Sequence, residues 1–158
     1  MALILHGKST CCFCNQVLND DADYRGFPHF VGNSNDELFK YSDNAFHIDC
    51  LNAAPIGAKL IRYADEFIRF IAPGNRKCVV TGELITKQED HIMIGYLTSD
   101  EASALHQFNF THIHRNNLAK WQDQSKLLSL LLSLRDSENW QNHYPQQYLS
   151  MLIQSITL

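Results

Sequence analysis

Hydrophobic residues recur with a helical period between positions 55 and 72, in "PIGAKLIRYADEFIRFIA". The apolar stripe consists of Leu60, Ala64, Phe67 and Ile71, with Ile61 and Ile68 beside it, while Lys59, Arg62, Asp65 and Arg69 face elsewhere. Such spacing is typical of an amphipathic helix that packs on a core. The Pro-Gly-Asn cluster at 73–75 predicts a turn that ends this helix.

On each side of that helix lies a segment with the residue pattern of a β-strand. The segments "YRGFPHFVG" (24–32) and "DHIMIGYLT" (90–98) read as strands. We expect a helix to open near residue 47 in the first half, capped by Asp43 or Asn44, and near residue 112 in the second, capped by Asn109 or Thr111. Residues 120–140 and 144–158 predict two further helices, the last starting at Pro145.

The two halves of the chain resemble each other. Aligning "CFCNQVL" with "CVVTGELI" on Cys11 and Cys78 places Cys14 on Thr81. Aligning "NAFHIDCLN" with "NFTHIHRNN" places His47 on His112 and Cys50 on Arg115. The gap between the two elements is 32 residues in the first half and 30 in the second. This order and spacing favour an internal duplication, with domains at 1–72 and 73–158, although chance similarity of short apolar strings is the alternative.

Composition limits the class of protein. Of the 158 residues, 45% are hydrophobic and 19% are charged, a composition typical of globular proteins. The net charge is −4, so the chain lacks the basic excess typical of nucleic-acid-binding proteins. The start "MALILHGKST" does not look like a signal peptide, and the longest apolar run, "LLSLLLSL", is too short to span a membrane. We therefore expect a cytoplasmic protein. In a reducing compartment, five cysteines indicate metal binding before disulfides.

The first half carries a candidate zinc site. Cys11 and Cys14 form a C-x-x-C pair in a tight turn, helped by Asn15, which tolerates a left-handed conformation. His47 and Cys50 are three apart, so they share a face in a first helical turn. Together they offer the tetrahedral three-cysteine, one-histidine set that Zn²⁺ prefers, with no position left for water. We predict one structural Zn²⁺ and no catalytic residue; the alternative is that the four are ordinary core side chains. Cys12 is a spare thiol that could replace Cys11 in the ligand set, although a C-x-C pair is less common.

These four positions, within residues 9–52, resemble treble-clef zinc fingers, the class to which LIM and RING-type modules are related. The resemblance implies a knuckle, a β-hairpin and a helix that carries the last two ligands. RING-type fingers interleave two zinc sites and LIM modules use a shorter gap, so ubiquitin-ligase activity is not implied. The expected fold is α+β: two tandem treble-clef-like modules plus C-terminal helices. The second module, with Cys78, Thr81, His112 and Arg115, is expected to be metal-free, since arginine does not ligate. The alternative is a weak site completed by His114 or His91, neither of which has the expected spacing.

Two classes of function fit this reading. The stretches "LILHGKSTCCFC", "FKYSDNAFHIDCL" and "PGNRKCVVTGELI" resemble small bacterial immunity proteins of polymorphic toxin loci. That resemblance implies a protein partner, a toxin domain, which the acidic chain would bind and neutralise. An HNH-like nuclease is the enzymatic alternative, because "EDHI" and "NFTHIHRNN" contain Asp, His and Asn, although Asn109 stands only three residues before His112. A transcription or chromatin adaptor is the third possibility.

Overall fold

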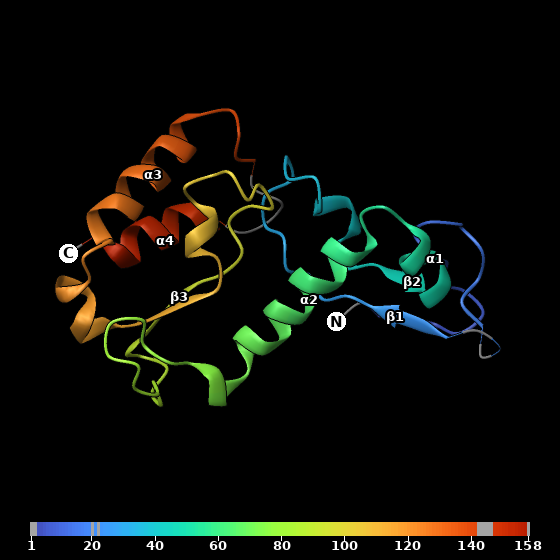
Figure 1. The fold of residues 1–158 in the computed structure, drawn as a ribbon, viewed down its shortest axis with the longest axis horizontal. Coiled ribbons are helices and arrows are strands. Elements are labelled where there is room, and N and C mark those ends of the chain that lie inside the picture. Colours follow the sequence, from blue (N-terminus) through green and yellow to red (C-terminus); the bar gives the residue numbers. More distant parts are fainter. Residues whose placement is uncertain (1–2, 20, 22, 142–146, 158) are drawn as a thin grey trace.

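The computed structural model describes residues 3–19, 21, 23–141 and 147–157 and has a mixed α+β fold (Figure 1). The first part of the chain contains β1 (Tyr24–Gly26), the 3₁₀ turn η1 (Phe39–Tyr41), β2 (Ala45–His47), α1 (Ile48–Ala53) and α2 (Gly57–Ile71). The second contains η2 (Pro73–Asn75), β3 (His91–Ile94), η3 (His106–Phe108), β4 (Thr111–His114), η4 (Arg115–Lys120), α3 (Gln124–Asp136) and α4 (Tyr148–Ile156).

The strands form two small antiparallel pairs. β1 pairs with β2, with Tyr24 opposite His47, and β3 pairs with β4, with His91 opposite His114. In Figure 1 the two pairs lie in separate lobes and α2 runs diagonally between them. Each strand pair leads directly into a short helix, so the residue that ends β2 or β4 also precedes a helical turn.

Equivalent elements recur at one constant spacing. η1, α1 and α2 begin 67 positions before η3, η4 and α3, the same separation as from Cys11 to Cys78 (78 minus 11). The hydrogen bonds recur as well. The Asp43 N–H donates to the Pro28 carbonyl and the Phe110 N–H donates to the Gly95 carbonyl, each at a distance of 3.1 Å. We call residues 9–71 the first unit and residues 76–138 the second unit. The two units thus share one backbone plan without insertion or deletion.

Two left-handed residues occupy the same place in that plan. Asp43 has φ of 56° and Phe110 has φ of 59°, a conformation that costs energy for any residue with a Cβ. Just before them, Ser42 Oγ accepts the N–H groups of Phe30 and Val31. In the second unit the Asn109 side-chain oxygen accepts the equivalent two N–H groups. A small polar residue therefore ties this loop to the segment that follows β1 or β3 in both units.

The expected helix caps Asp43, Asn44, Asn109 and Thr111 are wrong, because a strand separates them from the helix. Because β2 and β4 intervene, α1 begins only at Ile48 and η4 at Arg115, each after a histidine. Asp43 and Asn44 lie upstream of β2, and Asn109 and Thr111 before or within β4. The strand lies between these residues and the helix, and the side chains of Asn44 and Asn109 bond to backbone groups upstream of it.

Helix α2 confirms the predicted element but not all of its buried face. Leu60 and Ala64 are fully buried, whereas Ile68 and Ile71 are 47% and 41% exposed. Tyr63 and Phe70 are buried in their place. The buried face is therefore rotated toward the aromatic residues of the second unit, which the helical period alone did not indicate.

Each lobe has its own core, and the two are joined by aromatic side chains. Tyr96, from the second unit, is buried in the first core and lies edge-on to Tyr63, with ring centroids 5.3 Å apart. Phe110 packs on Phe70 at 5.5 Å and on Phe67 at 6.4 Å. Helix α2 is thus covered by residues of the second unit.

The two C-terminal helices cover the second core. α3 and α4 confirm the predicted helices, while Pro145 lies outside the described residues. Leu127 and Leu131 of α3 pack with Leu149 and Leu152 of α4. Among the helices of the described residues, none has the length and hydrophobicity needed to cross a membrane.

Candidate metal centre

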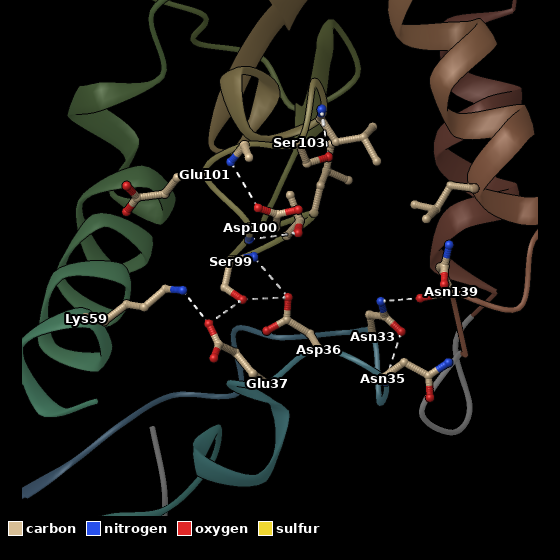
Figure 2. A pocket seen from close by; sticks show the side chains of 15 residues that line it. Asn33, Asn35, Asp36, Glu37, Lys59, Ser99, Asp100, Glu101, Ser103 and Asn139 are labelled. Carbon is tan, nitrogen blue, oxygen red and sulfur yellow. Dashed lines mark hydrogen bonds and ion pairs between the residues drawn. The ribbon is translucent and has the colours of Figure 1, made fainter. Parts of the chain in front are cut away.

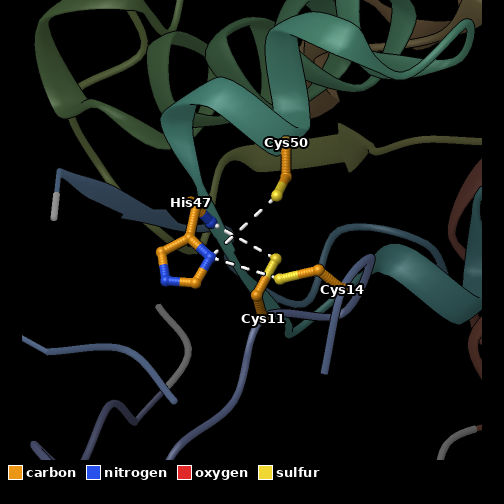
Figure 3. Close-up of side chains that lie close together, drawn as sticks. All are labelled: Cys11, Cys14, His47 and Cys50. Atoms are coloured by element: carbon orange, nitrogen blue, oxygen red, sulfur yellow. Dashed lines mark hydrogen bonds between the residues drawn. The ribbon is translucent and has the colours of Figure 1, made fainter. Parts of the chain in front are cut away.

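The structure brings the four predicted ligands together. One ligand atom from each of Cys11, Cys14, His47 and Cys50 lies within 4.8 Å of all the others. His47 Nδ1 is 3.4 Å from Cys14 Sγ and 4.0 Å from Cys50 Sγ, so this nitrogen faces the sulfur atoms (Figure 3). Residues 33 positions apart in the sequence therefore converge on one point.

Three elements place these side chains. Cys11 and Cys14 lie in a turn that two backbone hydrogen bonds close. The Cys11 N–H donates to the Gln16 carbonyl at 2.8 Å, and the Asn15 N–H donates to the Cys11 carbonyl at 2.8 Å. Asn15 has φ of 58°, which confirms its predicted left-handed conformation. His47 ends β2, and Cys50 projects from the first turn of α1.

The electrostatics of the cluster suit a cation. Burial raises the pKa of the Cys11 thiol, but backbone N–H groups of Cys14, His47 and Phe13 outweigh it and lower that pKa to about 7. The contact with Cys14, followed by burial, raises the pKa of the Cys50 thiol to about 11. Three thiolates this close repel one another, and a divalent cation between them removes that repulsion.

The ligand set defines what the site can do. Three cysteines and one histidine form a group that could hold one metal ion, consistent with a single zinc. With four protein ligands, no coordination position remains for water or substrate, and structural zinc sites have this closed form.

Cys12 lies beside the cluster but outside it. Its Sγ is 3.9 Å from the Lys40 carbonyl oxygen, and burial followed by the charge of Cys11 raises its pKa. Its backbone N–H donates to the Ala45 carbonyl over 2.9 Å. Cys12 thus ties the turn to β2 through its backbone.

The structure corrects the sequence alignment of the second half. The His47 N–H lies 3.4 Å from Cys11 Sγ, and the matching bond in the second unit runs from the His114 N–H to Cys78 Sγ, 3.3 Å. His114, and not His112, is therefore the counterpart of His47. By the same spacing Asn117, and not Arg115, is the counterpart of Cys50. The gap of 32 residues is the same in both units, a regularity that an ungapped comparison of the sequence would have revealed.

His112 and Arg115 have other surroundings. His112 Nδ1 is 2.8 Å from His91 Nε2, and the His112 ring stacks on Phe70 at 4.2 Å. Both histidines are buried, and desolvation lowers the pKa of His112 to about 4. Arg115 donates from Nε to the Glu89 carbonyl.

The residues that resemble an HNH motif are engaged inside the fold. The Asn109 amide nitrogen donates to the Thr98 carbonyl, and its oxygen accepts from Leu97 and Thr98. His91 and His112 face each other in the core. Asn109 occupies the position of Ser42 in the first unit, where the same two backbone bonds are made.

A large cavity lies where the two units meet. It measures about 1210 Å³ and is lined mainly by the loops 33–37 and 97–103 (Figure 2). Its acidic residues are Asp36, Glu37, Asp100 and Glu101. Asp36 Oδ2 accepts the N–H and hydroxyl of Ser99, at 2.9 and 3.2 Å. Glu37 and Glu101 form ion pairs with Lys59 and Arg62, which keep the pKa of both carboxyls below its ordinary value.

Comparisons of the chain with models of protein families, with curated proteins and with solved structures find no match.

Proposed function

We propose that the protein is a non-catalytic binding module, stabilised by one structural Zn²⁺, that recognises another protein. The observation that carries this proposal is the closed ligand set of Cys11, Cys14, His47 and Cys50, which leaves a metal no free position for chemistry. The metal contributes folding free energy to a unit whose strands are only three residues long.

We also propose that each unit is treble-clef-like and that the two arose by duplication. The order of turn, strand pair and helix, with the last ligands at the end of β2 and the start of α1, supports the first point. The constant spacing of 67 positions between Cys11 and Cys78, repeated in the helices and turns, supports the second.

The partner that best fits the surface is a basic protein segment. Four carboxylates line the cavity between the units, two of them ion-paired with Lys59 and Arg62, and the chain carries a net charge of −4. Such a surface attracts a basic partner over distance and discourages nucleic acid. A toxin domain neutralised by this protein is the partner that we propose.

The test uses the genes adjacent to this one. Each neighbour is expressed alone in a host cell and then together with the wild-type protein. One neighbour should arrest growth alone and be neutralised by the wild type, and the purified pair should associate more slowly as salt rises. Asp100→Asn with Glu101→Gln should weaken that association, whereas Lys126→Gln, outside the cavity, should not. If no neighbour is toxic and none binds, the immunity proposal is wrong.

Zinc content distinguishes the structural part of the proposal from the functional part. Protein purified without added metal should carry about one zinc per chain and cleave neither DNA nor RNA when magnesium or manganese is added. Metal-dependent cleavage that Asn109→Ala abolishes while the protein stays folded would favour the nuclease instead.

A further inference from the structure

The second unit keeps the frame of the first unit's metal centre. By the constant spacing, the four positions of Cys11, Cys14, His47 and Cys50 are occupied by Cys78, Thr81, His114 and Asn117. Two of these four, Cys78 and His114, still have the side chain of a zinc ligand. This inference rests on the proposed zinc site of the first unit.

The turn that presents the first ligand is the same in both units. The Cys78 N–H donates to the Glu83 carbonyl over 2.8 Å, and the Gly82 N–H donates to the Cys78 carbonyl over 2.7 Å. Gly82 has φ of 73°, in the place of Asn15 at 58°. The Val79 N–H donates to β4 as the Cys12 N–H donates to β2. The second unit therefore already has the backbone turn that a C-x-x-C pair requires.

The thiol of Cys78 is held as a ligand thiol would be. It is 1% exposed and accepts the His114 N–H at 3.3 Å. Burial raises its pKa, but N–H groups of His114, Val80 and Thr81 outweigh that effect and lower the pKa below its ordinary value. These N–H groups stabilise negative charge on sulfur, as they do in the first unit.

Hydrogen bonds fill the place of the missing ligands. The Asn117 amide nitrogen is 3.7 Å from Cys78 Sγ, so it approaches the sulfur from the position of Cys50. His114 Nδ1 accepts the Asn116 N–H at 3.2 Å, whereas His47 caps no N–H and turns the same nitrogen toward the sulfurs. The turn after β4 is also a 3₁₀ helix, where the first unit has the α-helix α1.

We propose that the second unit is a vacated zinc site, which Thr81→Cys together with Asn117→Cys would restore. The completed set would be the cysteines at 78, 81 and 117 with His114, the same order and spacing as in the first unit. The cation is Zn²⁺, because three thiolates and one imidazole in a tetrahedron favour it. The imidazole of His114 needs only to release one exposed N–H, that of Asn116.

The experiment compares zinc per chain in the wild type, the double cysteine variant and a matched double serine variant, Thr81→Ser with Asn117→Ser. Each protein is refolded with excess Zn²⁺, dialysed, and measured by elemental analysis. The expected content is one, two and one zinc per chain. With Co²⁺ in place of Zn²⁺, the thiolate charge-transfer absorbance per chain should rise about twofold in the cysteine variant alone.

The outcomes separate this inference from the proposed function. One zinc in both the wild type and a folded cysteine variant would overturn the inference and leave the first site standing. No zinc in the wild type would remove the first site as well. If the double variant does not fold, Asn117→Cys alone, which has three of the four ligands, must bind Co²⁺ more tightly than the wild type when the first site of both proteins already holds Zn²⁺. Equal affinity would also overturn the inference.

Discussion

Gly57, the first residue of α2, leaves no room for a side chain. A Cβ at this position would lie 1.7 Å from the backbone carbonyl oxygen of Leu51, in α1. Ordinary van der Waals contact begins at 3.4 Å, so Gly57→Ala must push α1 away by about 1.7 Å, the difference between 3.4 and 1.7 Å. Since α1 carries Cys50, the displacement reaches the metal centre.

The two opposing effects of Gly57→Ala have known sizes. Alanine favours a helix over glycine by about 0.5–1 kcal/mol, and overpacking costs about 1–3 kcal/mol. The clashing atom belongs to the backbone and cannot rotate away, so the cost falls at the upper end. We expect a net loss of about 2 kcal/mol in the free energy of unfolding, equivalent to about 4–8 °C in Tm for a chain of this size.

The assay measures thermal and urea unfolding with zinc bound, together with zinc affinity by competition with a chelator. Gly74→Ala is the matched control, because nothing lies within 4 Å of its added Cβ. The control should change stability by less than about 0.5 kcal/mol and leave zinc affinity unaltered. A Gly57→Ala protein as stable as the control, with unchanged zinc affinity, would refute the proposed contact between α1 and α2.

Three further changes test the site and the core. Cys14→Ala should lose the zinc and several kcal/mol of stability, as judged by elemental analysis and thermal unfolding, while Cys12→Ala should keep its zinc; equal zinc loss in both would contradict the ligand assignment. Ser42→Ala leaves two N–H groups without their acceptor and should cost about 1–3 kcal/mol in urea unfolding, against little change for Ser125→Ala at an exposed position of α3. Buried His112 has a pKa lowered to about 4, so the unfolded chain binds its proton first, and stability should fall as pH drops from about 6.5 toward 4, by at most about 1.4 kcal/mol per pH unit. His112→Leu should flatten that part of the stability curve, and an unchanged slope would show that His112 does not titrate in this way.

The cluster of three cysteines and one histidine was the part of the structure that the sequence predicted best. The spacing of Cys11, Cys14, His47 and Cys50 is a local signal, because each pair is positioned by one turn of backbone. The left-handed Asn15 and the helix at 57–71 were also predicted correctly, since turn chemistry and helical period act over a few residues.

The errors arose where distant parts of the chain decide the structure. Ile68 and Ile71 match the helical period but are exposed, because Tyr96 and Phe110 approach α2 from the second unit on another side. His112 matched His47 by the letters around it, whereas strand register makes His114 the equivalent residue. Register and packing depend on partners that are far away in the sequence, so local patterns did not reveal them.

Helix α4 has no equivalent in the first unit, and it covers the second core. The Tyr148 hydroxyl accepts the Gly95 N–H at 2.7 Å, at the position where the first unit has Pro28, which has no N–H. In the first unit, Tyr96 and Phe110 of the next unit cover α2; in the second, α4 takes that place over α3. Removing α4 would expose the apolar side chains of α3, such as Leu127 and Leu131, that Leu149 and Leu152 now cover. We expect a chain without α4 to self-associate through this exposed patch.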